Sequence, residues 1–234
     1  MAERLAPLPA AFAATRDSLH ALACYAIAPA RKARTGRIGL RPTGDGFGTP
    51  AEPDGSRLAA VRGDRLLLGT GDGAAITTVR AAAERLGVTP SSDPGVGSDL
   101  PAFTPDADLA VEAGASLALG RWFRFGAGVL DALAARPPPG AAISEAQLWP
   151  EHFDLAVTAT LAGGRAVNVG ASPGDAYCAQ PYLYVGPHDP TGLAGDHWNA
   201  PFGALLAYDA LAASADPATA GLAFVARGLD LLAE

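Results

Sequence analysis

Hydrophobic residues recur at helical spacing in several parts of the chain, and this spacing predicts where the helices lie. In residues 9–33, Phe12, Leu19, Leu22 and Ala26 fall on one helical face. The same period predicts helices over residues 77–87 and 111–135, and a last helix that starts at Asp216-Pro217. The chain therefore has helices near its start, in its middle and at its end.

Alternating hydrophobic and polar residues predict strands between these helices. Ile38 and Leu40 alternate with polar residues or glycine in residues 36–41, and residues 57–76 contain short strands joined at a Gly-Asp turn. The pattern of residues 151–161 predicts one strand, and a second strand is expected around Asn168. Gly163-Gly164 between them predicts the turn of a hairpin. Residues 181–186 and 203–209 predict two further strands. Because the joining turns are too short for crossover connections, we expect most strand pairs to be antiparallel.

The order of these elements predicts an α+β fold. Each half of the chain has a helix, then antiparallel strands, then a helix, which suggests a pseudo-repeat of two units around one core. We expect a single compact domain over residues 1–234, or two packed halves at 1–110 and 111–234. The 234 residues, of which 49% are hydrophobic, are sufficient for such a core.

Composition and charge narrow the classes of partner. The net charge is -7 and only 18% of residues are charged, which argues against nucleic acid as a partner. The longest apolar stretch is too short to cross a bilayer, and the N-terminal residues do not have the pattern of a signal peptide. Cys24 and Cys178 form no disulfide framework. We therefore predict a cytoplasmic protein.

Residues 88–108 contain four prolines together with several Ser, Asp and Gly residues, so no regular structure is expected there. A long stretch of this kind in a compact domain is either a connector or a loop that covers a site.

The predicted strand 151–161 carries the densest cluster of reactive side chains. Alternation places His152 and Asp154 on the face opposite Phe153 and Leu155, and they are the candidate acid/base residues. The candidate binding residues come from this segment and the strands and loops after it: Trp149, Glu151, Asn168, Asp175, Tyr182, Tyr184, Trp198 and Asn199. The pattern fits a pocket for a small molecule, in a binding protein or an enzyme. It also fits the solvent side of a half-exposed sheet.

Three other patterns have alternative interpretations. Residues 170–174 match G-x-S-x-G, but Pro173 lacks the backbone N–H that a nucleophile elbow requires, so a turn is favoured. The basic residues in 31–41 suit an anionic ligand, the acidic face of a partner or a solvated helix end. Residues 198–202 could form the contact surface of a non-catalytic binding or assembly module. No pair of candidate ligands has a diagnostic metal-site spacing.

Several segments resemble a bacterial family classed as a domain of unknown function. They include "TRDSLHALA", "RWFRFGAGVLDAL", "LWPEHFDLAVTATLAGGR", "PYLYVGP" and "HWNAPFGALLAYDAL". The most specific mark of that family is a Trp followed by Phe-Asp-Leu-Ala, here Trp149 and residues 153–156. The chain departs from the family by one extra residue after the Trp, and by "RAVNVG" where the family has Tyr-Ser-His-Glu. The resemblance implies a location of interest but no reaction.

Overall fold

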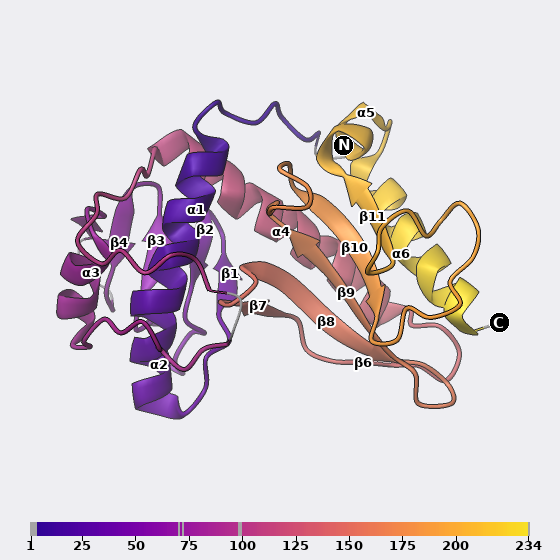
Figure 1. Cartoon of the computed structure of the whole chain (residues 1–234), viewed down its shortest axis with the longest axis horizontal. Coiled ribbons are helices and arrows are strands. Elements are labelled where there is room, and N and C mark those ends of the chain that lie inside the picture. Colours follow the sequence, from indigo (N-terminus) through magenta and orange to yellow (C-terminus); the bar gives the residue numbers. More distant parts are fainter. Residues whose placement is uncertain (1–3, 70, 72, 98–99, 234) are drawn as a thin grey trace. The chain divides into compact units, whose positions relative to one another are not determined.

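The computed structural model describes residues 4–69, 71, 73–97 and 100–233, and it confirms the α+β class (Figure 1). The chain divides into two compact units, which are described separately. The first, here the helix-first unit, comprises Leu8–Arg124 and Leu148–Asp154. The second, here the sheet unit, comprises Met1–Pro7, Phe125–Gln147 and Leu155–Glu234. These boundaries differ from the predicted halves at 1–110 and 111–234, and they divide helix α4 (Ala113–Ala135) between the two units after residue 124.

The helix-first unit begins with one long helix, as its hydrophobic period predicted. It is made of α1 (Phe12–Leu22), the π-helical turn η1 (Ala23–Ile27) and α2 (Ala28–Thr35). All five residues of η1 are buried. A π-turn places an extra residue in the helix and is frequent at functional sites. The hydrophobic period alone gave no sign of this insertion.

Five short antiparallel strands form the sheet of this unit, in the order β1-β2-β3-β4-β5. Their bounds are β1 (Arg41–Thr43), β2 (Gly46–Gly48), β3 (Ala60–Arg62), β4 (Arg65–Leu67) and β5 (Ala74–Ala75). The first strand starts later than the predicted 36–41, and Leu40 forms only a single bridge with Leu148 of β7 (Gln147–Trp149). The predicted Gly-Asp turn between β3 and β4 is present, with Gly63 at φ 57°.

Helix α3 (Val79–Leu86) ends at a left-handed Gly87, as predicted, and the Thr78 side chain caps its start. The described part of the 88–108 segment then runs without helix or strand. Val96 is buried in a cluster with Cys24 and Tyr25, and Phe103 packs against that cluster. The Tyr25 hydroxyl donates a hydrogen bond to the carbonyl of Pro101. This segment therefore covers the π-turn with its own apolar side chains.

The sheet unit contains a second antiparallel sheet in the order β11-β10-β9-β8-β6. The bounds are β6 (Ala142–Ile143), β8 (Asp154–Thr160), β9 (Ala166–Ser172), β10 (Tyr182–Pro187) and β11 (Ala204–Ala207). The turn between β8 and β9 contains Gly163 and Gly164 with φ of 87° and 86°. Only glycine adopts two such values in succession without strain, which explains why the sequence signal for this hairpin was reliable.

Helices cover one face of this sheet. A methyl group at Gly126 of α4 would lie 2.4 Å from Cβ of Ala171, so glycine allows the helix backbone to approach β9 closely. Helix α6 (Pro217–Ala233) packs on β10, and the Asp216 side chain caps its start as predicted. The short helix α5 (Tyr208–Ala213) lies between β11 and α6 in the chain. Within the described residues, no helix is long and apolar enough to span a membrane.

Candidate anion-binding site

The end of α2 places three arginines around one cavity of the helix-first unit. Arg31 and Arg34 are three residues apart on α2, so they lie on one face of the helix. Gly36 ends the helix at φ 72°, and Arg37 follows immediately. The Thr35 hydroxyl donates to the Arg31 carbonyl at 2.9 Å and accepts from the Arg37 N–H at 3.3 Å. These two bonds fix the backbone that presents the arginines.

The opposite wall of the cavity is the segment that follows β2. Thr49 is buried and extends the pairing, because its N–H donates to the Ala59 carbonyl at 2.8 Å. The backbone of Glu52 is fixed by a hydrogen bond from its N–H to the Ser56 carbonyl at 2.8 Å. Backbone hydrogen bonds thus position the lining residues of this wall: Thr49, Pro50, Ala51, Glu52 and Leu58.

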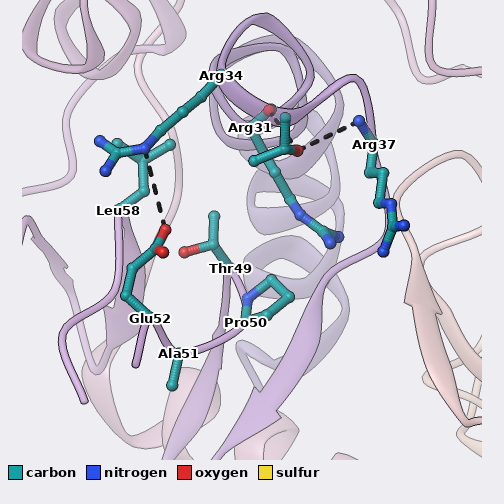
Figure 2. A pocket seen from close by; sticks show the side chains of 9 residues that line it. Arg31, Arg34, Arg37, Thr49, Pro50, Ala51, Glu52 and Leu58 are labelled. Carbon is teal, nitrogen blue, oxygen red and sulfur yellow. Dashed lines mark hydrogen bonds and ion pairs between the residues drawn. The ribbon is translucent and has the colours of Figure 1, made fainter. Parts of the chain in front are cut away.

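The cavity has a volume of about 330 Å³, within the lower range of small-molecule sites. In Figure 2 the side chains of Arg31 and Arg37 extend in the same direction, while Arg34 reaches toward Glu52. Nε of Arg34 lies 3.9 Å from Oε1 of Glu52. Arg31 is only 8% exposed, so its guanidinium is confined by its surroundings. Three cationic side chains and one carboxylate therefore line this cavity.

Only part of the predicted basic patch belongs to this cavity. Nζ of Lys32 donates to the Gly95 carbonyl at 2.6 Å, and Nη1 of Arg41 donates to the Leu40 carbonyl at 3.3 Å. Neither residue lines the cavity. The helical period explains the division, because Lys32 lies about 100° around the helix axis from Arg31.

The strand that was predicted to carry His152 and Asp154 starts later than the alternation suggested. Strand β8 begins at Asp154, and residues 150–153 form a turn instead of the start of a strand. Phe153 has φ of 53°, which breaks the alternation that placed His152 beside Asp154. Asp154 itself is 7% exposed and lies in the strand as predicted. The strand prediction for residues 151–153 is therefore wrong.

The turn at 150–153 is packed against the helix that contains the π-turn. The His20 ring stacks on Phe153 with ring centroids 5.2 Å apart, and its Nε2 lies 3.1 Å from the Glu151 carbonyl oxygen. The Cys24 thiol donates to the Pro150 carbonyl at 3.0 Å. Burial lowers the pKa of His20 and raises the pKa of the Cys24 thiol. A buried thiol with a raised pKa is a poor nucleophile, so this cluster is a packing feature.

In the sheet unit, Asn168, Tyr182 and Tyr184 lie on one face, as the alternation predicted. Gly186 pairs with Asn168, and Tyr184 pairs with Gly170. Oδ1 of Asn168 accepts hydrogen bonds from the Thr158 hydroxyl at 3.0 Å and from Nε2 of His188 at 3.2 Å. Tyr182 is buried and packs against Phe202.

The other predicted binding residues mainly hold local structure. Asp175 accepts hydrogen bonds from the N–H groups of Tyr177 and Cys178 and, at 2.6 Å, from the Tyr182 hydroxyl. Asn199 exchanges two hydrogen bonds with the backbone of Leu205 at the edge strand β11.

The remaining candidates lie in local packing contacts. Trp198 contacts the His197 ring, and Trp149 ends strand β7. Ser172 is a buried residue at the end of β9 and accepts from the Gly174 N–H, so residues 170–174 form no nucleophile elbow. In the parts of the chain that the structure describes, no group of three or more His, Cys, Asp or Glu side chains is placed to hold a metal ion.

Comparisons with family models, with curated proteins and with solved structures gave no significant match for this chain. The family resemblance thus stays a prediction. The cluster of basic residues in 31–41 was the sequence signal for the cavity. The distant members Thr49, Glu52 and Leu58 carried no such signal, because only the tertiary structure brings them to α2.

Proposed function

We propose that this protein binds a small anionic ligand in the cavity lined by Arg31, Arg34 and Arg37. The observation that carries the proposal is the charge of the lining: three guanidinium groups and one carboxylate. In a chain of net charge -7, this local excess of positive charge opposes the overall field. An arginine keeps its proton throughout the physiological pH range, so the cavity stays cationic.

The chemistry of the arginines favours a carboxylate or phosphate. A guanidinium presents its N–H donors in a planar fork that matches two oxygens of such a group. Confinement of Arg31, which is 8% exposed, supports this role, because a side chain that is already ordered loses little entropy when the ligand binds. Pro50, Ala51 and Leu58 would contact the apolar part of the ligand.

This proposal places the ligand away from the residues that the sequence favoured. Asp175 and Asn199 of the sheet unit already use their side-chain oxygens for backbone groups. The alternative of a binding or assembly surface at Trp198–Phe202 rests on one further observation: Tyr177, which contacts Phe202, is 53% exposed. A cytoplasmic location is part of the proposal, and the free thiols of Cys24 and Cys178 are compatible with it.

Thermal unfolding and calorimetry in phosphate, sulfate and citrate at low ionic strength test the proposal. A ligand at 100 times its Kd adds about 2.7 kcal/mol to the free energy of unfolding, which raises the Tm measurably. Arg37→Gln should weaken binding at least about tenfold, because a charge-assisted hydrogen bond contributes about 1.5–3 kcal/mol.

Arg121→Gln is the matched control, since Arg121 is exposed on α4 and does not line the cavity. It removes the same charge from the same unit. Anion binding that Arg121→Gln weakens as much as Arg37→Gln does would show a general charge effect and overturn the proposal. If none of the three anions binds, the proposal is overturned as well.

A further inference from the structure

A second cavity adjoins the first one in the helix-first unit. It also has a volume of about 330 Å³. Arg34, Glu52 and Leu58 line both cavities, so the two share a wall. The second cavity adds Arg57 and, from the last turn of α3, Arg85. The two cavities therefore adjoin each other, with arginines in each, and the pair is here called the groove.

The charges in this groove are arranged with the carboxylate in the middle. Arg31 and Arg37 line only the first cavity, whereas Arg57 and Arg85 line only the second. Glu52 lies in the shared wall, where it would repel a negative group on a ligand. The favourable positions for anionic groups are thus the two outer parts, one on each side of Glu52.

Hydrogen bonds tie the two parts together. The Arg57 guanidinium donates to the carbonyl of Thr49, and Thr49 lines the first cavity. The Glu52 N–H donates to the carbonyl of Ser56, which lines the second cavity. One stretch of backbone, residues 49–58, therefore carries lining residues of both cavities, and its internal hydrogen bonds hold them in one arrangement.

We infer that the ligand is a small organic molecule with an anionic group at each end, a bisphosphate, a phosphocarboxylate or a dicarboxylate. One end binds at Arg31 and Arg37, and the other binds at Arg57 and Arg85. The linker between them is uncharged and lies beside Leu58 and Glu52. This inference rests on the proposed anion site. It adds a second anionic group to the ligand, at a set distance from the first.

Calorimetry with α,ω-alkane bisphosphonates of increasing length tests the inference. The affinity of each bisphosphonate is compared with that of the alkylphosphonate of equal length. Joining two binding groups makes the second contact intramolecular, so a bisphosphonate of matching length should bind at least about tenfold more tightly than its mono-acid. Shorter and longer members should lose that advantage. Matched dicarboxylates and phosphocarboxylates then distinguish the acid type.

The arginine variants locate the second contact. Arg85→Gln should reduce the ratio of bisphosphonate to alkylphosphonate affinity by about tenfold, as expected for one lost charge-assisted contact, and Arg121→Gln should leave that ratio unchanged. If alkylphosphonates bind and no bisphosphonate of any length binds more tightly, the inference is overturned while the proposed anion site stands. If Arg85→Gln leaves the ratio at its original value, the second contact is also refuted. If neither class binds, the anion site itself is refuted.

Discussion

Nε of Arg34 lies 3.9 Å from Oε1 of Glu52, in the wall that the two arginine-lined cavities share. Both side chains are substantially exposed, 60% for Arg34 and 40% for Glu52. An exposed ion pair of this kind contributes about 0–1 kcal/mol to stability. We therefore expect its main effect on the proposed anionic ligand, because Glu52 is the one carboxylate among the described residues that line the two cavities.

Glu52→Gln should strengthen the binding of phosphate while it changes the free energy of unfolding by less than about 1 kcal/mol. The reason is that the substitution removes the repulsion between Glu52 and the anion and releases Arg34. Calorimetry at low salt measures the affinity, and urea unfolding measures the stability. Asp131→Asn also removes one negative charge, at an exposed position in the other unit. It should leave the affinity for phosphate nearly unchanged. Weaker phosphate binding by Glu52→Gln would contradict this role.

The positive φ of Phe153 should reverse the usual order of alanine and glycine variants. Phe153 is buried against Phe47 and Phe123, so Phe153→Ala should destabilise the protein by about 3–5 kcal/mol. Phe153→Gly also loses the ring but relieves the strained backbone, which is worth about 1 kcal/mol, so it should be the less destabilising change.

Phe123 provides the comparison, because it is a buried ring in helix α4. There Gly should be more destabilising than Ala by about 1 kcal/mol. Urea unfolding of the four variants measures both differences. The same order of Ala and Gly at the two positions would argue against strain at Phe153.

Burial of His20 should make the protein less stable as the pH falls. The pKa of His20 in the folded chain is lower than its ordinary value of 6.5, mainly because burial disfavours the charged ring. The unfolded chain therefore binds this proton more tightly, and the free energy of unfolding decreases as the pH falls below about 6.5. His20→Gln should flatten that dependence in urea unfolding between pH 7.5 and 5.5.

His197 contributes in the same direction, because burial also lowers its pKa, so a part of the slope remains in His20→Gln. An unchanged slope in His20→Gln would show that the ring is protonated equally in both states.

Asp175 should stabilise the sheet unit through its three donors. Asp175→Ala leaves the N–H groups of Tyr177 and Cys178 and the Tyr182 hydroxyl without this acceptor, which should cost about 0.5–1.5 kcal/mol. In a double-mutant cycle with Tyr182→Phe, the coupling should be about 0.5–3 kcal/mol.

Asp189→Ala is the control for this prediction, because Asp189 also accepts a turn N–H, from Thr191, and that contact is local to its own exposed turn. Its effect on the free energy of unfolding should be the smaller one. Additive effects of Asp175→Ala and Tyr182→Phe would refute the contribution of their hydrogen bond.

The sequence determined most of the secondary structure, because the signals are local. Helical spacing from Phe12 to Ala26 requires one apolar face, Gly87 permits the left-handed end of α3, and Gly163-Gly164 permits the tight turn between β8 and β9. Alternation also placed Asn168, Tyr182 and Tyr184 on one face of the sheet correctly. Each of these features depends on neighbours within a few residues.

Only the tertiary structure decided where the candidate site lies. The Phe153 ring packs in the aromatic core beside Phe47 and Phe123, and Phe153 has a positive φ. Strand β8 therefore starts at Asp154 and leaves His152 outside it. The sequence showed a cluster of basic residues in 31–41, but it did not show which of them share a cavity or that Glu52 lies opposite Arg31 and Arg34. That relationship depends on contacts between residues distant in the chain, which no local period encodes.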